Sequence, residues 1–188
     1  MIILASQSPR REEILKSVIG NLPFKIIPSN FDEDKIDEKD LKKLCLLEAV
    51  NKGMIISEKN RDDYIISADT MVYFQGRKLG KPKDKEDAFS TLKELQNNTH
   101  EIVTAQCIIK DGKILKESIC TSVLFIDKMD DEKIKEYVDT LSPLDKAGSY
   151  GIQDEKYISS KIISGERETI MGLCKKQLIS DLKSLNII

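Results

Sequence analysis

The sequence has little of what builds metal centres and cross-links: it contains no tryptophan, one histidine and four cysteines in 188 residues. The cysteines stand singly, without a CxxC pair or a nearby histidine, so their spacing predicts neither a zinc site nor a disulfide framework. We expect four buried, reduced thiols: Cys45, Cys107, Cys120 and Cys174. Long apolar runs are also missing, since the opening run of residues 1–5 is far shorter than the about 20 residues of a membrane span. These absences favour a cytoplasmic protein.

A large excess of charge of one sign is also absent, because 30 basic residues stand against 32 acidic ones and the net charge is −2. Such a balance gives no general attraction to nucleic acid or to an anionic membrane, so a polyanionic ligand must be met by a local basic cluster. Hydrophobic residues make up 40% of the chain, which is long enough to bury one substantial core. We therefore expect a single domain over residues 1–188.

A basic pair stands where a helix is expected to begin, in the stretch ASQSPRREEIL. Ser8 suits the N-cap and Pro9 the first helical position, which places Arg10 and Arg11 in the first turn. The positive end of the helix dipole disfavours basic residues there by roughly 0.3–1 kcal/mol each. Either the two side chains are solvated or paired with carboxylates, or an anion completes the site, and a phosphate suits both the helix end and two guanidinium groups.

The remaining pattern mixes strands and helices. Strands are expected at 2–5, 24–28, 64–67, 71–74, 100–110, 113–126 and 157–163, and helices at 9–19, 41–60, 85–96, 130–140 and 169–185. Asp111-Gly112 is typical of a tight hairpin turn. The order predicts an α/β fold that combines parallel crossovers with at least one antiparallel hairpin.

Four single residues attract attention. Asp69 follows an apolar strand and ends it, where an acid is hard to leave uncompensated, although turn and helix-cap aspartates are also common there. Lys52 is a charge among apolar neighbours. Lys81 lies in GKP, which lacks the glycine spacing and the Ser/Thr of a P-loop. His100 has no partner at metal-ligand spacing and no GxSxG elbow accompanies it, so we expect a structural role.

Several motifs, taken together and in order, resemble one known family. ASQSPRREEIL, SADTMVYFQGRKLGKPKDKEDAFSTLKEL, NNTHEIVTA and SPLDKAGSYGIQ are closely similar to motifs of the Maf-like nucleoside triphosphate pyrophosphatases, from Leu4 to about Leu173. The resemblance implies an elongated α/β fold, with a mixed, partly antiparallel sheet flanked by helices and a central cleft. It also implies a homodimer that hydrolyses nucleoside triphosphates to the monophosphate and pyrophosphate with a divalent metal.

The resemblance assigns roles residue by residue. Asp69 matches the proton acceptor, and Glu33, with Asp69, matches the carboxylates that hold Mg²⁺ or Mn²⁺, a hard cation that prefers oxygen ligands. Positions that match the family's triphosphate contacts are Ser6, Ser8, Arg11, Lys52 and Lys81.

Substrate choice is implied at Arg10, Thr70 and Gln153. The Gln153 amide offers an acceptor for the N3–H of thymine or uracil and a donor for the adjacent carbonyl, whereas a glutamate would suit guanine. YGIQ resembles the branch that takes dTTP and UTP, so we expect these and modified pyrimidine nucleotides as substrates. Asp154 after YGIQ and Cys174 in GLC depart from the family's usual glycine and proline.

Two other functions remain open on the sequence. The family is also associated with inhibition of septum formation, so the protein could be a nucleotide-binding regulator of cell division, but an acid at both Asp69 and Glu33 favours catalysis. An inosine-triphosphatase type of nucleotide cleaner is the other alternative, and it would prefer purines.

Overall fold

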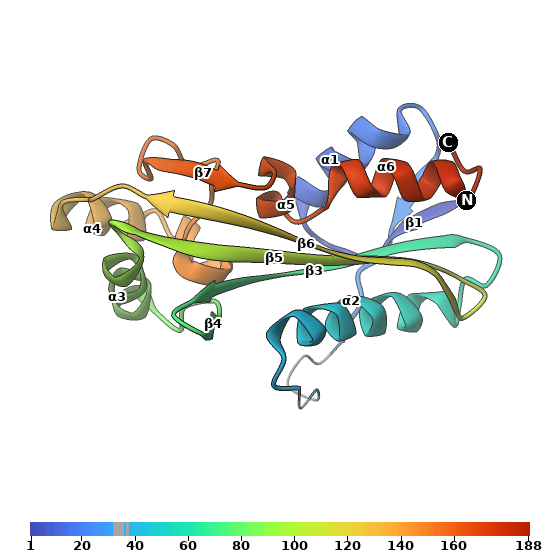
Figure 1. The fold of residues 1–188 in the computed structure, drawn as a ribbon, viewed down its shortest axis with the longest axis horizontal. Helices are drawn as coiled ribbons and strands as arrows, with labels where there is room; N and C mark the ends of the chain where they lie inside the picture. The colour runs from blue at the N-terminus through green and yellow to red at the C-terminus, as the bar shows by residue number, and fades with distance from the viewer. Residues whose placement is uncertain (32–35, 37) are drawn as a thin grey trace. The chain divides into compact units, whose positions relative to one another are not determined.

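The computed structural model describes residues 1–31, 36 and 38–188, and Figure 1 shows their fold. Its strands are β1 (Ile2–Leu4), β2 (Phe24–Ile26), β3 (Tyr64–Phe74), β4 (Arg77–Leu79), β5 (Asn98–Lys110), β6 (Lys113–Ile126) and β7 (Ser160–Ser164). Its helices are α1 (Pro9–Ile19), α2 (Leu41–Ser57), α3 (Lys85–Leu95), α4 (Asp131–Asp139), α5 (Arg167–Met171) and α6 (Lys175–Ser184), with 3₁₀ turns η2 (Ser142–Asp145) and η3 (Ala147–Ser149). None of the helices in these described ranges is long and apolar enough to cross a membrane.

The strands form one mixed sheet, which confirms the predicted α/β class. Their order is β2-β1-β3-β5-β6-β7, and β4 pairs with β3 outside this path. β1 runs parallel to β2 and to β3, while β4 on β3 and β7 on β6 are antiparallel. The predicted hairpin between β5 and β6 is confirmed: Asp111 and Gly112 have φ of 49° and 68°, as a tight two-residue turn requires.

The chain divides into two compact units. The first comprises residues 1–70, 104–120 and 171–188, and the second comprises residues 71–103 and 121–170. Because the boundaries fall inside β3, β5 and β6, each of these strands contributes residues to both units.

The first unit buries both faces of its strands. Alternate residues such as Leu4 and Ile66 pack with α1 and α6 on one face, while Ile3 and Ile65 pack with α2 on the other. Figure 1 shows α2 on one side of these strands and α1 and α6 on the opposite side. Burial on both faces explains why β1 and the start of β3 are continuous apolar runs rather than alternating ones.

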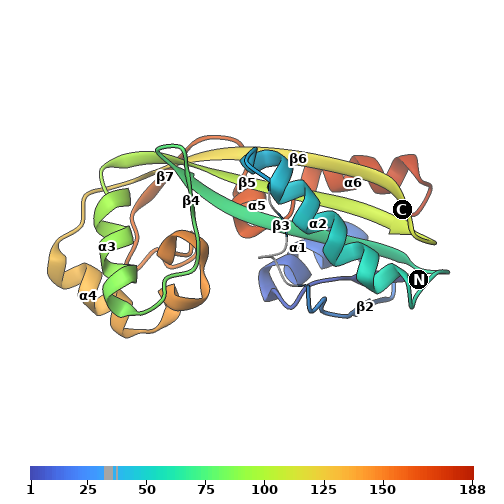
Figure 2. The ribbon, with the colours of Figure 1, turned by 90° about the horizontal axis from the view of Figure 1, so that it is seen from below.

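The second unit is built around α3, which packs against α4 and the two 3₁₀ turns; α3 and α4 lie side by side in Figure 2. The start of α3 is fixed locally, as its sequence predicts. The Asp84 side chain accepts from the Asp87 amide at 2.8 Å, and the Asp87 carboxylate accepts from the Lys83 amide at 2.9 Å. These bonds satisfy backbone donors that a helix start leaves open.

Several predictions differ from the structure: β4 was not predicted, and the strand expected at 157–163 begins only at Ser160. Two other differences bear on the candidate site. β3 does not end at Asp69 but continues through it to Phe74, so Asp69 and Thr70 lie in mid-strand. The predicted last helix is two helices, because Gly172 has φ of 114° and interrupts the chain between α5 and α6. Side chains far away in the sequence contact both positions, as described below.

The cysteines are reduced, as predicted, but not all are buried. Cys45, Cys107 and Cys174 are buried, whereas Cys120 is half-exposed on β6. Burial raises the pKa of the Cys107 thiol to about 11, which keeps this thiol protonated near neutral pH.

Candidate functional site

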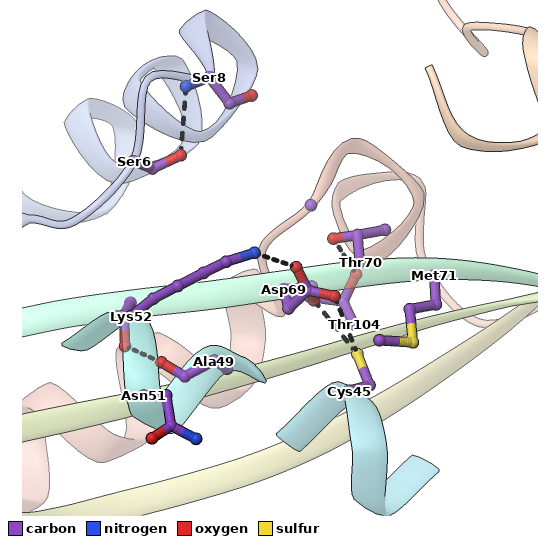
Figure 3. A network of polar contacts seen from close by, with 12 residues as sticks. Ser6, Ser8, Cys45, Ala49, Asn51, Lys52, Asp69, Thr70, Met71 and Thr104 are labelled. Carbon is purple, nitrogen blue, oxygen red and sulfur yellow. Dashed lines mark hydrogen bonds and ion pairs between the residues drawn. The ribbon is translucent and has the colours of Figure 1, made fainter. Parts of the chain in front are cut away.

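Asp69 forms a buried ion pair in the first unit. Lys52 on α2 places its Nζ 2.6 Å from Asp69 Oδ1, and the two side chains are 13% and 9% exposed (Figure 3). A carboxylate in the middle of a buried strand is costly unless a counter-charge compensates it. The ammonium group of Lys52 supplies that compensation, and β3 can therefore continue through Asp69 without a turn.

Two further side chains on α2 share the face of Lys52. Cys45 and Glu48 precede it by seven and four residues, a spacing that brings all three to the same side of a helix. Cys45 Sγ lies 3.8 Å from Asp69 Oδ2, and Glu48 is 1% exposed. Burial, followed by the charge of Asp69, raises the pKa of the Cys45 thiol well above its ordinary value. Asp69 is thus met by the Lys52 ammonium on one carboxylate oxygen and by the protonated Cys45 thiol on the other.

Thr70, the next residue of β3, faces the opposite way and meets Arg11. The Arg11 guanidinium donates from Nη2 to Thr70 Oγ1 at 3.1 Å, from Nε to the Gly172 carbonyl at 2.9 Å and from Nη1 to Ser6 Oγ at 3.3 Å. Thr70 Oγ1 also lies 2.9 Å from Thr104 Oγ1 on β5. Three segments of the chain therefore fix one cationic side chain at the start of α1.

The start of α1 is otherwise as predicted, with Ser8 at the N-cap and Pro9 first in the helix. The Ser8 side chain makes no capping bond; instead its amide donates to Ser6 Oγ at 3.1 Å (Figure 3). Arg10 is half-buried. The Ser6 hydroxyl and the Arg11 guanidinium thus meet at the positive end of a helix, an arrangement that can bind phosphate.

The contact of Arg11 with the Gly172 carbonyl requires a residue without a side chain at position 172. A Cβ at Gly172 would stand 2.9 Å from Arg11 Nε, and its positive φ is one that side chains rarely adopt. Sequence reasoning missed this contact, as well as the buried Gln106 of β5, whose amide meets the backbone of Cys174. The only signal for Gln106 was an uncharged polar residue inside the apolar run IVTAQCII.

The second unit carries Lys81 and Gln153, both of them exposed. Lys81 lies in the loop between β4 and α3, next to Gly80, whose carbonyl accepts from the amide of Gly148 at 3.1 Å. Gln153 folds back over Gly151, where an added Cβ would come within 2.4 Å of Gln153 Nε2. A glycine at 151 therefore leaves room for the Gln153 amide.

Asp154, a departure from the family pattern, is bound within the second unit. Its Oδ2 accepts from the hydroxyl of Tyr137 at 2.5 Å and from that of Ser142 at 3.1 Å. The same Tyr137 oxygen accepts from the Gly151 amide at 3.1 Å. Asp154 and Tyr137 therefore hold the turn on both sides of Gln153.

His100 has a structural environment, in line with the expectation from its sequence context. It is 3% exposed, and its Nε2 lies 2.5 Å from the Tyr150 hydroxyl. Burial lowers the pKa of His100 to about 4, so its imidazole is neutral near pH 7.

The fit of a metal ion depends on oxygen donors. Among the described residues, no group of three or more histidine, cysteine, aspartate or glutamate side chains is arranged to hold one. Glu33, the second predicted ligand, lies outside the described residues. Asp69 itself has suitable chemistry: Lys52 contacts its Oδ1, while the contact of its Oδ2 is with the Cys45 thiol. Proteins commonly bind Mg²⁺ through one or two carboxylates together with the phosphates of the substrate.

Two curated proteins of similar sequence carry the same name. A dTTP/UTP pyrophosphatase from Clostridium botulinum (strain Okra / Type B1) is 40% identical over 192 residues, covering 99% of this chain and 97% of that protein. A dTTP/UTP pyrophosphatase from Pyrococcus furiosus is 44% identical over 172 residues, covering 92% of this chain and 88% of that protein.

Solved structures and a family model complete the comparison. A Ham1 protein from Staphylococcus aureus aligns with a TM-score of 0.51 at 13% identity, over 98% of each chain. A HAM1 protein from Coxiella burnetii aligns with a TM-score of 0.50 at 16% identity, over 97% of this chain and 98% of that one. At such identities these two show a shared fold. The model of the Maf-like protein family matches residues 1–185, and with relatives at 40% identity and above along nearly its whole length, the chain belongs to the Maf-like family.

Proposed function

We propose that this protein hydrolyses nucleoside triphosphates, in particular dTTP and UTP, to the monophosphate and pyrophosphate. The observation that carries the proposal is the buried pair of Lys52 and Asp69, in a chain whose relatives are named dTTP/UTP pyrophosphatases. Arg11, with the Ser6 and Thr70 hydroxyls that it contacts in the same unit, adds support, because these groups can bind an anion at the start of α1.

In the proposed reaction a water attacks the α-phosphorus, the bond from that phosphorus to the oxygen bridging to the β-phosphate breaks, and pyrophosphate leaves with the bridging oxygen. Asp69 accepts the proton of the attacking water. Arg11 and Lys52 stabilise the negative charge on the phosphates and on the leaving pyrophosphate. Because Lys52 contacts Asp69 at 2.6 Å, its ammonium also holds the carboxylate in place.

The proposal includes a divalent cation held by Asp69 and Glu33. When bound, Mg²⁺ or Mn²⁺ supplies charge neutralisation on the triphosphate and orientation of the attacking water. The oxygen chemistry of Asp69 suits either ion. Ser6 and Ser8 provide hydroxyl donors, and Lys81 keeps its predicted role toward the phosphates.

Base choice is assigned to Arg10, Thr70 and Gln153, as the resemblance implies. Gln153 carries the most direct chemistry, because one amide offers both the acceptor and the donor that a thymine or uracil edge needs. The bonds of Asp154 and Tyr137 on both sides of it support a fixed backbone for the turn that carries Gln153.

The deciding experiment measures release of pyrophosphate from dTTP, UTP, ATP, GTP and inosine triphosphate, with Mg²⁺, with Mn²⁺ and with a chelator. We expect dTMP and pyrophosphate from dTTP, no release with the chelator, and no turnover by Asp69→Asn. Failure of every triphosphate to release pyrophosphate would overturn the proposal.

Other outcomes of the same experiment identify the alternatives. Tight binding of dTTP without hydrolysis would indicate a regulator of cell division, which the names of the relatives do not favour. A preference for inosine triphosphate would indicate a purine-directed cleaner. We further propose that residues 1–188 act as one Maf-like domain, as a homodimer in the cytoplasm, with no nucleic acid or membrane as partner.

A further inference from the structure

The side-chain amide of Gln106 binds the turn between α5 and α6 through both its oxygen and its nitrogen; we call this pair of bonds the clamp. Its Oε1 accepts from the Cys174 amide at 2.9 Å, and its Nε2 donates to the Cys174 carbonyl at 3.4 Å. Gln106 is 2% exposed and lies in the middle of β5. A buried primary amide that pairs its oxygen and one of its two N–H groups with the backbone of a single residue fixes the position of that residue.

The clamped turn is the one that holds Arg11. The Gly172 carbonyl, two residues before Cys174, accepts from Arg11 Nε at 2.9 Å. The Cys174 thiol adds a contact to the Thr104 carbonyl at 3.4 Å, and the Thr104 hydroxyl lies 2.9 Å from Thr70 Oγ1. A series of short contacts therefore joins Gln106 to the guanidinium group from two directions.

We propose that Gln106 is a positioning residue for Arg11: by fixing the backbone of Cys174 it fixes the Gly172 carbonyl, and through that carbonyl the guanidinium that meets the substrate's phosphates. The inference rests on the proposed function for the role of Arg11, but the placement of Arg11 can be measured without any substrate. Gln106 itself does not touch the substrate.

Two variants remove the clamp in different ways. Gln106→Met keeps the length of the side chain and loses both hydrogen bonds. Cys174→Pro removes the amide donor together with the thiol contact to the Thr104 carbonyl. Its backbone should stay in place, because Cys174 precedes α6 with φ of −80°, which a proline ring adopts without strain. Gln106→Glu keeps the acceptor for the Cys174 amide. Because burial favours the neutral carboxyl group, its O–H can still donate to the Cys174 carbonyl, so it is the conservative variant that should retain part of the function.

The activity test is a double-mutant cycle with Arg11. We expect Gln106→Met to lower kcat/KM for dTTP by between about 10-fold and 100-fold, as a misplaced substrate-positioning group does, and Gln106→Glu to lower it less. In an Arg11→Met background, Gln106→Met should have no further effect. The matched control is Ser57→Ala, which removes a bond from the Gly112 amide to a fully buried hydroxyl of the same unit. It should leave kcat/KM unchanged.

The second readout follows Arg11 directly by NMR. The chain has five arginines, so the Nε–H signal of Arg11 can be assigned in ¹⁵N-arginine-labelled protein by its loss in Arg11→Lys. Hydrogen exchange at this Nε–H should speed up in Gln106→Met and in Cys174→Pro, and stay unchanged in Ser57→Ala. Unchanged exchange in both clamp variants, or equal losses of kcat/KM with and without Arg11, would overturn the inference. If the wild-type protein releases no pyrophosphate, the proposed function fails, and the exchange measurement still decides whether Gln106 positions Arg11.

Discussion

Lys52 Nζ lies 2.6 Å from Asp69 Oδ1, which joins a cation of α2 to a carboxylate in the middle of β3. Both groups are largely withdrawn from water, so each depends on the other for the compensation of its charge. The pair therefore serves stability and the proposed chemistry at once, and the two contributions can be separated by mutation.

Lys52→Met should lower the free energy of unfolding by about 3 kcal/mol, because it leaves the Asp69 carboxylate buried without its counter-ion. Urea denaturation at pH 7 measures this change. The double variant Lys52→Met/Asp69→Asn removes both charges and should regain most of the loss, while both proteins lack pyrophosphatase activity. An unaltered unfolding free energy in Lys52→Met would contradict the importance of the pair.

Gly172→Ala should reduce both stability and activity, because a Cβ there meets Arg11 Nε at 2.9 Å and the φ of 114° is unfavourable for alanine. The cost in unfolding free energy should exceed about 1 kcal/mol. Gly112→Ala is the matched control: its φ is 68°, but nothing lies within 4 Å of the added Cβ. Thermal unfolding should show a loss in both variants, and kcat/KM for dTTP should fall only in Gly172→Ala. Equal activity in the two would argue against a role for the Arg11 contact.

Gln153→Glu should weaken hydrolysis of dTTP and raise that of GTP relative to it. A carboxylate accepts from the two adjacent N–H groups of guanine but cannot donate to a pyrimidine carbonyl. The ratio of kcat/KM for dTTP and GTP is the measurement, with Gln75→Glu, at an exposed position of the same unit, as a control for added charge. A ratio that does not change would remove Gln153 from substrate choice.

His100 should make the protein less stable in mild acid. Burial lowers its pKa to about 4 in the folded protein, against 6.5 for a free side chain. Between pH 6.5 and pH 4 the unfolded chain therefore binds a proton at His100 that the folded chain does not bind. The free energy of unfolding falls as the pH drops below 6.5 and levels off below pH 4. The expected loss between pH 7.5 and pH 5 is about 2 kcal/mol.

Urea denaturation at several pH values checks this expectation. His100→Gln cannot titrate and should lack the change across this window, although it loses part of the bond to Tyr150 at every pH. A wild-type stability that is flat between pH 7.5 and pH 5 would show that His100 is protonated without cost.

Local features were predictable from the sequence because their causes lie within a few residues. Asp84 and Asp87 fix the start of α3 through bonds over three or four positions. Asp111-Gly112 fixes the β5–β6 hairpin through its own backbone preferences. The residues of the candidate site were found differently, through the resemblance of whole motifs. Lys81 alone is almost uninformative, and Asp69 alone is also compatible with a turn or helix-cap aspartate.

The sequence by itself determined the class of fold, the capped helices and the family to which the chain belongs. Periodicity, turn residues and motifs each depend on residues that are close together in the sequence. Only the tertiary structure decided that β3 continues through Asp69 and that the last helix breaks at Gly172. In each case the partner is distant, Lys52 by 17 residues for Asp69 and Arg11 by 161 residues for Gly172. Local pattern carries no information about such a partner. The Lys52 ion pair lets a strand pass through Asp69, and at Gly172 a positive φ that glycine tolerates turns the carbonyl to Arg11.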